Sequence, residues 1–274
     1  MKDLGLKRLG VIGAGKMGAM LIDAWVSGGA ISADAVVATA KTKGRRDHLR
    51  NKHSVTVSDD NRAAVRDADV VLLAVKPQIA PDVLAELGEV MNENQVLWSI
   101  IAGLSTRETE EALGRDGIPV VRAMPNTPSR VGCGMTVLCG GRWATQEHLD
   151  VAWDHFNRLG NALTLDEKHF DAVTGLSASG PAFIYIVIEA LAEGGVKVGL
   201  PRDVATTLAA QTCLGAGKMV LETGDHPARL KDEVTTPAGC TMDGILKLEE
   251  GGLRVTLIKA VVEARNRAAG LVEG

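Results

Sequence analysis

The feature that most constrains the fold is an alternation of short β-branched runs and amphipathic stretches over the first 165 or so residues. Strands separated by helical stretches of about 10–15 residues are typical of βαβ units, in which helices cover both faces of a parallel sheet. The run Val70–Val75 is apolar on both faces, as expected of a central parallel strand. The alternation predicts a mostly parallel, doubly wound α/β domain. The expected strands are Leu9–Ile12, Val36–Ala40, Val70–Val75, Val96–Ile100, Val120–Ala123 and Met135–Cys139, and the expected helices are Met17–Ser27, Arg45–Lys52, Ile79–Met91, Thr106–Leu113 and Thr145–Arg158.

After Thr164 the chain shows helical periodicity and no convincing strand. Two of the expected helices are apolar over much of their circumference, so they must be buried, and about 110 residues offer too few places to bury them. A subunit interface would bury the apolar surface of these helices. We therefore divide the chain into an α/β domain at 1–165 and an all-α dimerisation and substrate domain at 166–274. The expected helices here are Lys168–Thr174, Ser179–Val198, Arg202–Glu222, Met242–Glu250 and Leu253–Leu271.

The stretch VIGAGKMG follows the first expected strand and opens the first expected helix. In this arrangement one glycine allows a tight turn, another lets the backbone approach a pyrophosphate, and a third permits close packing of helix on strand. The stretch predicts that the first domain is a Rossmann domain that binds a dinucleotide. The expected contacts are Gly13, Ala14, Gly15, Lys16, Met17 and Gly18.

The end of the second expected strand distinguishes the two nicotinamide dinucleotides. An NAD site uses a carboxylate there to accept a hydrogen bond from the ribose 2′-hydroxyl. This strand continues as VVATAKTKGRRD, with the hydroxyl of Thr39 and four cations before the first acid, Asp47. We predict NADPH as the cofactor, with NADH as the alternative. The expected contacts in this slot are Thr39, Lys41, Arg45 and Arg46, with Lys43 as the fourth cation.

Two further loops follow expected strands. Lys76 and Pro77 come after Val70–Val75, and MPNTP comes after Val120–Ala123. Ligands of open α/β sheets lie outside the carboxyl ends of the strands. We therefore expect Asn126 and Thr127 to contact the nicotinamide or the substrate, although the prolines of this loop could also serve only to shape a turn.

Near the C-terminus, a helical pattern stops at Val234, and a loop of small residues leads to a second helix at or near Thr241. Backbone N–H groups at a helix N-terminus can hold a carboxylate or a phosphate, and the Thr241 hydroxyl can bond beside that anion. The alternative is a plain helix–helix connection capped by Thr241.

Composition and patterning exclude several other classes. With a net charge of −4, no basic block and few aromatic residues, the chain shows no sign of nucleic-acid binding. Its four cysteines have no metal-ligand spacing, so we expect free thiols and no metal. None of the six histidines lies in a motif loop. The N-terminus lacks the apolar core of a signal peptide and no run approaches about 18 apolar residues. We expect a cytoplasmic protein that does not bind a membrane.

The motifs VIGAGKMG, AVKP, MPNTP, SASGPAF and LKDEVTTPAGCTMDGILKLEE stand in this order on one chain, which resembles the pyrroline-5-carboxylate reductase family from the first strand to the last helix. The resemblance implies NAD(P)H-dependent reduction of 1-pyrroline-5-carboxylate to L-proline, the final step of proline biosynthesis. It also implies a Rossmann domain joined to a helical dimerisation domain, assembly into dimers and rings of dimers, and an active site between one subunit's nucleotide domain and its partner's helices.

The same resemblance implies residue roles. Backbone N–H groups of the C-terminal loop hold the substrate carboxylate, and the Thr241 hydroxyl, the one catalytic side chain we assign, reaches the ring nitrogen. The substrate contacts are Thr236, Pro237, Ala238, Gly239, Cys240, Thr241, Ser179 and Asn126, with Ser177, Gly180 and Pro181 shaping the pocket. The further cofactor contacts are Asn61, Ala74, Val75, Lys76 and Pro77. The family loop often has Pro-Gly-Gly where this chain has Pro237, Ala238 and Gly239.

Three other functions remain open on the sequence. One is reduction of a related cyclic imine, such as the six-membered homologue. A second is a β-hydroxyacid dehydrogenase, which shares the glycine-rich opening but uses an interdomain lysine, whereas Ser179–Val198 carries no lysine before Lys197. A third, of a different class, is a non-catalytic NADP(H)-sensing protein.

Overall fold

The computed structural model describes residues 6–237 and 239–270. They form two compact units, the first made of residues 6–178 and 264–270 and the second of residues 179–263. The boundary that the sequence predicts between residues 165 and 166 lies ahead of this division, and the domain assignment stays a prediction.

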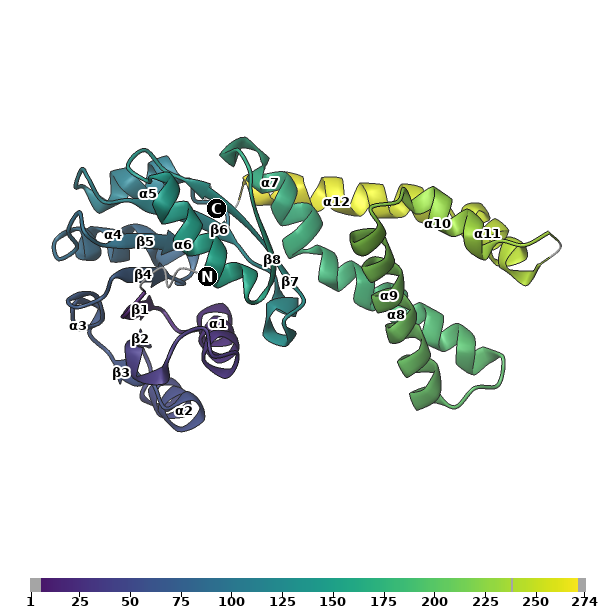
Figure 1. Cartoon of the computed structure of the whole chain (residues 1–274), viewed down its shortest axis with the longest axis horizontal. Helices are drawn as coiled ribbons and strands as arrows, with labels where there is room; N and C mark the ends of the chain where they lie inside the picture. The colour runs from purple at the N-terminus through teal and green to yellow at the C-terminus, as the bar shows by residue number, and fades with distance from the viewer. Residues whose placement is uncertain (1–5, 238, 271–274) are drawn as a thin grey trace. The chain divides into compact units, whose positions relative to one another are not determined.

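The first unit is built on one sheet of eight strands in the order β3-β2-β1-β4-β5-β6-β7-β8 (Figure 1). All neighbouring strands run parallel except β6 and β7, which are antiparallel with Met124 opposite Val137. This confirms the predicted mostly parallel, doubly wound α/β fold. The strand order reverses between β1 and β4, which is where such sheets bind dinucleotides. The strands are β1 (Leu9–Ile12), β2 (Val36–Thr39), β3 (Thr56–Ser58), β4 (Val70–Leu73), β5 (Val96–Ser99), β6 (Val120–Met124), β7 (Gly134–Gly140) and β8 (Gly160–Thr164).

Helices cover both faces of this sheet, as the fully apolar β4 requires. Val70 and Leu72 point to the face covered by α1 (Lys16–Ser27), α2 (Lys43–His53) and α6 (Gln146–Asn157), whereas Val71 and Leu73 point to the opposite face. That opposite face is covered by α3 (Asn61–Val65), α4 (Ala80–Gly88) and α5 (Thr106–Leu113).

Three elements of this unit were not predicted. The strand β3 has three residues, none of them buried, at the edge of the sheet, and α3 has only five residues. The strand β8 is also an edge strand, and only one of its five residues is buried. Short, exposed edge elements lack the apolar periodicity on which sequence assignment rests.

A composite helical segment, residues 167–178, leads from the sheet of the first unit to the second unit. Where the sequence predicts one helix at Lys168–Thr174, the structure has a 3-10 turn at Glu167–His169, the short helix α7 (Phe170–Val173) and a π-helical turn at Thr174–Ala178. Single π-helical turns often mark functional sites because they break the regular hydrogen-bond ladder.

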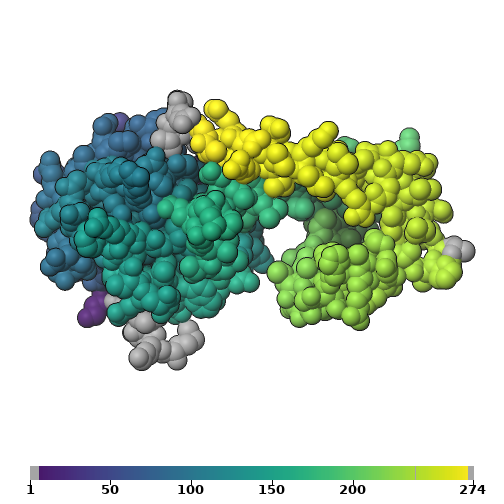
Figure 2. Space-filling view, turned by 90° about the horizontal axis from the view of Figure 1, so that it is seen from above, coloured from purple at the N-terminus to yellow at the C-terminus, as the bar shows by residue number. Residues whose placement is uncertain are grey.

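The second unit is helical, as predicted. Its elements are α8 (Gly180–Lys197), α9 (Arg202–Thr223), α10 (Pro227–Val234), α11 (Cys240–Glu250) and most of α12 (Leu253–Ala269). Its buried core consists of small residues, namely Ala192, Ala205 and Ala209. Many large apolar side chains are exposed instead, among them Ile184, Tyr185, Ile186, Leu208, Leu214, Leu221, Leu246 and Ile258. Figure 2 shows side chains of these helices, green to yellow, on the surface of the unit.

One helical stretch, Glu167–Lys197, is long and apolar enough to cross a membrane by length and composition alone, with a mean hydropathy of 1.5 and 11% of its apolar window buried. The expectation that no run approaches this length was wrong, because the isoleucines, valines, leucine and phenylalanine of α8 outweigh its few charged residues. A helix that packs against a second protein chain passes the same test.

Candidate functional site

The glycine-rich loop leaves β1 in a tight turn that only glycine adopts easily. Gly13 has φ +84°, and a Cβ there would meet the Val75 side chain at 2.5 Å. Gly18 lies against the end of β4, where a Cβ would approach Ala74 to 3.2 Å. Ala74 and Val75 therefore pack directly against the loop. A side chain at the exposed Gly15 would meet no protein atom closer than 3.9 Å, so the outer side of the turn has room for a phosphate.

The N-terminus of α1 is available for an anion. Gly15 is its N-cap and supplies no side-chain cap. Within the described parts of the chain, the N–H groups of Lys16 and Met17 donate to no protein acceptor, and the first intrahelical bond runs from Ala19 N to Gly15 O. Free N–H groups and the helix dipole favour negative charge at this point. The predicted dinucleotide contacts are thus held in a geometry that suits a pyrophosphate.

The side chain of Thr39, at the end of β2, holds the glycine-rich loop in place. The Thr39 hydroxyl accepts from Gly13 N at 3.1 Å and donates to Asn61 Oδ1 at 2.9 Å, and Asn61 Nδ2 donates to Glu86 Oε2 at 2.9 Å. Thr39 is 3% exposed. We predicted that Thr39 contacts the cofactor. In the structure its hydroxyl bonds to Gly13 and Asn61 and holds the loop, and a contact of Thr39 with the cofactor stays a prediction. Glu86, on α4, was missed because nothing in its local sequence marks it.

Arg45 and Arg46, adjacent in the sequence, have different partners. Arg45 donates from Nε to Ala14 O at 2.9 Å and from Nη2 to Gly15 O at 2.7 Å, so its guanidinium lies beside the glycine loop. Arg46 donates to the carbonyls of Ala40 and Lys41 and pairs with Asp59 at 3.1 Å. Arg46 is thus engaged by protein acceptors that hold the β2–α2 loop, and a direct contact with the cofactor stays a prediction. Lys41 and Lys43 are exposed.

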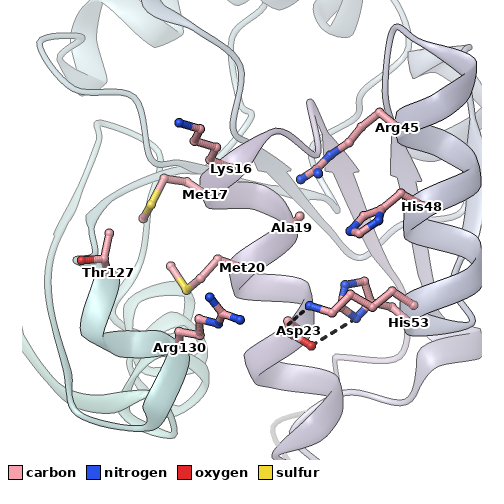
Figure 3. A pocket seen from close by; sticks show the side chains of 11 residues that line it. Lys16, Met17, Ala19, Met20, Asp23, Arg45, His48, His53, Thr127 and Arg130 are labelled. Atoms are coloured by element: carbon pink, nitrogen blue, oxygen red, sulfur yellow. Dashed lines mark hydrogen bonds and ion pairs between the residues drawn. The ribbon is translucent and has the colours of Figure 1, made fainter. Parts of the chain in front are cut away.

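A cavity of about 370 Å³ opens beside the loop, between α1, α2 and the 3-10 helix Thr127–Val131 (Figure 3). It brings Lys16, Met17 and Arg45 together with Thr127, which the sequence places on a separate loop. The hydrogen bond from Lys52 lowers the pKa of Asp23, the only acidic side chain of the described lining, and burial lowers the pKa of its other partner, His53. Four permanent cations against one carboxylate make the cavity positive in a chain of net charge −4. The lining is Lys16, Met17, Ala19, Met20, Asp23, Arg45, His48, Lys52, His53, Thr127 and Arg130.

The remaining strand-end residues lie at the same edge of the sheet. Lys76 is exposed and precedes the 3-10 turn Pro77–Ile79 that follows β4. Asn126 follows β6, but its side chain is half-buried and engaged: Nδ2 donates to Ser177 O at 3.1 Å and Oδ1 accepts from Met135 N at 2.9 Å. The structure therefore brings Asn126 to the π-helical turn and leaves its amide with protein partners.

The predicted substrate loop connects α10 and α11. The helix α11 begins at Cys240 with Gly239 as N-cap and no side-chain cap, so the expectation that Thr241 caps this helix was wrong. A Cβ on Gly239 would come within 2.4 Å of the Thr236 hydroxyl, and Gly239 N donates to Thr236 O at 3.0 Å. A residue with a Cβ at this N-cap would require the Thr236 hydroxyl to move, so the turn favours glycine there. Ala238 lies outside the described residues.

Thr241 consequently lies in the first turn of α11, half-buried, with Cys240 exposed beside it and Thr236 and Pro237 exposed before it. Among the described residues, neither Cys240 N nor Thr241 N donates to a protein acceptor, whereas Met242 N donates to Gly239 O at 3.2 Å. The loop thus presents backbone donors and one hydroxyl at a helix N-terminus, the combination expected for a carboxylate. Ser179 precedes α8 in the same unit.

Comparison with known proteins covers both units. Residues 167–271 match the family model for pyrroline-5-carboxylate reductase dimerisation, and residues 8–103 match the model described as NADP oxidoreductase coenzyme F420-dependent. The chain is 43% identical to the pyrroline-5-carboxylate reductase of Glycine max over 96% of its length and 95% of the relative's. It is also 43% identical to that of Methanosarcina acetivorans, over 97% of its length and 98% of the relative's. The chain belongs to the pyrroline-5-carboxylate reductase family.

Solved structures of this family share the fold of the whole chain. The Plasmodium falciparum pyrroline carboxylate reductase with NADP bound has a TM-score of 0.88 at 30% identity, covering 98% of this chain and all of that one. The Coxiella burnetii pyrroline-5-carboxylate reductase has a TM-score of 0.88 at 33% identity, covering 97% and 99%. Membership of the reductase family makes the chain an NAD(P)H-dependent oxidoreductase with a self-associating C-terminal region.

The cysteines do not change this conclusion. Burial raises the pKa of Cys139 to about 12, which makes it a poor nucleophile, and all four cysteines are free thiols, as expected. No group of three or more His, Cys, Asp or Glu side chains suited to a metal ion occurs in the part of the chain that the structure describes.

Proposed function

We propose that the protein reduces 1-pyrroline-5-carboxylate to L-proline with NADPH, the final step of proline biosynthesis. The observation that carries this proposal is the likeness of the entire chain, nucleotide unit and helical unit together, to pyrroline-5-carboxylate reductases at 43% identity. The glycine loop, its free N–H groups and the positive cavity beside it suit the phosphates of the cofactor.

The nicotinamide of the bound cofactor supplies the hydride that reduces the C=N bond, and the protein supplies position and electrostatics. On the nucleotide unit, Arg45 and the exposed Lys41 and Lys43 hold the 2′-phosphate of NADPH. The chemistry of this set supports that role, because Arg45 retains an Nη1 group beside the glycine loop for which no protein partner is found among the described residues.

The substrate carboxylate is held at the N-terminus of α11 by the N–H groups of Cys240 and Thr241. The Thr241 hydroxyl bonds to the ring nitrogen, which ends the reaction protonated. Two observations support this proposal: these N–H groups donate to no described protein acceptor, and the Gly239–Thr236 contact shapes the turn before them. The imine reacts in its iminium form, whose nitrogen has already taken a proton from solvent, so hydride addition to the C=N carbon gives the amine directly and no titrating side chain is required.

A homodimer formed by the C-terminal helices, assembled further into a ring of dimers, completes the proposed enzyme. The uncovered apolar side chains of α8, α9 and α11 support this, because among the described residues of this unit only alanines form the buried core. Burial in this subunit interface accounts for the apolar character of the stretch Glu167–Lys197 without a membrane. We therefore propose a cytoplasmic location. Light scattering of the purified protein should give a mass that is an even multiple of 28.8 kDa.

The substitution Thr241→Ala tests the catalytic role. We expect kcat/KM for the imine to fall about tenfold to a thousandfold, since one positioned polar contact contributes on the order of 1.4–4 kcal/mol to the transition state. NADPH affinity should stay within about twofold of wild type. The matched control is Thr164→Ala, at an exposed position of β8. Wild-type kinetics in Thr241→Ala would remove this hydroxyl from the mechanism.

Assaying the five- and six-membered imines with both NADPH and NADH separates pyrroline-5-carboxylate from its ring homologue as substrate. Tight NADPH binding with no turnover of either imine would favour the non-catalytic sensing function.

A further inference from the structure

Pro181 leaves a gap in the hydrogen-bond ladder where the chain passes from the π-helical turn into α8. It is the second residue of α8 and has no N–H, so the carbonyl four residues earlier, that of Ser177, loses its normal helical donor. The next N–H along, that of Ala182, donates to Ser179 O at 3.0 Å. A half-buried carbonyl without a donor is costly, so Ser177 O requires a donor from elsewhere.

Asn126 supplies that donor. Its Nδ2 lies 3.1 Å from Ser177 O, and its Oδ1 accepts from Met135 N at 2.9 Å. The two partners fix the orientation of the amide, because an N–H must face the oxygen and a carbonyl must face the nitrogen. Asn126 also stands opposite Met135 in continuation of the β6–β7 register, in which Met124 pairs with Val137. One side chain thus joins three segments: the loop after β6, the start of β7 and the π-helical turn.

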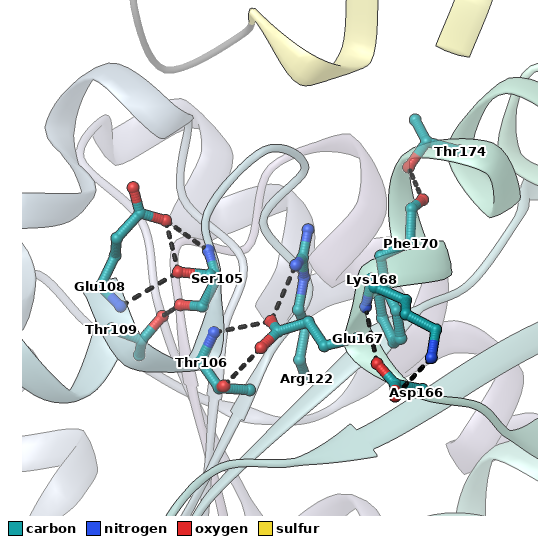
Figure 4. Close-up of polar contacts among 10 residues, drawn as sticks. All are labelled: Ser105, Thr106, Glu108, Thr109, Arg122, Asp166, Glu167, Lys168, Phe170 and Thr174. Atoms are coloured by element: carbon teal, nitrogen blue, oxygen red, sulfur yellow. Dashed lines mark hydrogen bonds and ion pairs between the residues drawn. The ribbon is translucent and has the colours of Figure 1, made fainter.

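The start of the same segment is fixed independently (Figure 4). The buried Arg122, on β6, donates to Glu167 Oε1 at 2.8 Å, and its guanidinium lies 4.6 Å from the centroid of the Phe170 ring. Glu167 also accepts from the N–H and the hydroxyl of Thr106. Residues 166–173 are therefore anchored without Asn126, and the π-helical turn is the part of the segment that depends on it.

We propose that Asn126 is a positioning residue for the reductase reaction and not a ligand of substrate or cofactor. Its amide holds Ser177 O to the loop after β6, and so gives one conformation to the backbone that leads, two residues later, into Ser179 at the start of α8. This inference rests on the proposed function for its catalytic consequence, but the structural part stands on the hydrogen bonds alone.

The isosteric substitution Asn126→Asp isolates the donor. The carboxylate still accepts from Met135 N but cannot donate to Ser177 O. We expect kcat/KM for the imine to fall about tenfold or more, with the NADPH dissociation constant within about twofold of wild type. As the pH is lowered and the carboxyl group gains a proton, its O–H can donate again, so the variant-to-wild-type ratio of kcat/KM should rise. The control Asn94→Asp adds the same charge at an exposed turn and should match wild type.

Hydrogen–deuterium exchange of peptides covering residues 174–183, measured on the full-length protein, gives a readout that does not need turnover. Exchange there should be faster in Asn126→Asp than in Asn94→Asp. Adding Pro181→Ala restores an N–H four residues after Ser177, so Asn126→Asp should change exchange less in that background. If Asn126→Asp alone folds poorly, exchange in the double variant is compared with exchange in Pro181→Ala instead.

Unchanged exchange in Asn126→Asp would overturn the positioning role. If NADPH binding is also weakened about tenfold in that variant, Asn126 is a cofactor ligand instead. A wild-type protein that binds NADPH but does not reduce the imine would overturn the proposed function instead, and the exchange comparison would still decide the role of Asn126.

Discussion

The proposed contact of Arg45 with the 2′-phosphate of NADPH can be tested by comparison with Arg46, the adjacent residue with the same side chain. In Arg45→Ala the cofactor loses a cation beside the glycine loop, and the loop loses two donors, to Ala14 O and Gly15 O. A hydrogen bond to a charged group contributes about 1.5–3 kcal/mol, and partial exposure of this site favours the lower end. The loop bonds act on NADPH and NADH alike, whereas the charge acts only on the 2′-phosphate. The NADPH preference should therefore fall about tenfold to thirtyfold.

The assay is the ratio of kcat/KM with NADPH to kcat/KM with NADH at fixed imine and fixed ionic strength. The matched control is Arg46→Ala, which removes the same side chain one residue along, where its donors serve Ala40 O, Lys41 O and Asp59. Arg46→Ala should change both cofactors alike and leave the ratio within about twofold. An unchanged ratio in Arg45→Ala, or an equal fall in both variants, would refute the assignment of the 2′-phosphate to Arg45.

Two further predictions concern the scaffold under the site. Thr39→Val keeps the shape of the side chain but removes the acceptor of Gly13 N, so the NADPH dissociation constant should rise about tenfold in a fluorescence titration, and unchanged binding would mean that this bond does not hold the loop. Glu167→Ala leaves the charge of Arg122 buried and unpaired, so the free energy of unfolding should fall by about 3 kcal/mol in urea titrations followed by tryptophan fluorescence. A loss below about 1 kcal/mol would show that water or another group compensates Arg122.

The features of the fold that the sequence predicted correctly are those that depend on residues close together in the chain. The glycine loop, the apolar strand β4 and the switch from α/β alternation to helices are written in neighbouring residues, and the structure confirms them. The predicted start of α11, at or near Thr241, agrees with its first residue, Cys240, but the sequence did not predict that Gly239 is the N-cap. Threonine is a common N-cap, and the contact that selects Gly239 instead, its approach to Thr236, appears only once the turn is built.

The partners of polar side chains are equally hidden from local pattern. Thr39 and Asn126 lie at or just after strand ends and Arg46 lies in the helix that follows β2, where ligand contacts are expected, yet each bonds to the protein itself. Their sequence positions predict the edge of the sheet correctly. Whether a side chain at that edge faces the ligand or the backbone depends on residues up to about 50 positions away, such as Ser177 for Asn126.

Thr39, Arg46 and Asn126 each hold a segment of backbone, and none of them forms part of a catalytic group. An anionic cofactor and a carboxylate substrate are bound best by backbone N–H groups, which carry no charge to be desolvated and are oriented by the helix. Such donors are useful only if their loops are rigid. Thr39 and Arg45 hold the glycine loop, as Asn126 holds the π-helical turn. How well these backbone donors bind therefore depends on how firmly the side chains fix the backbone, whereas the proposed preference for NADPH depends on the charge of Arg45.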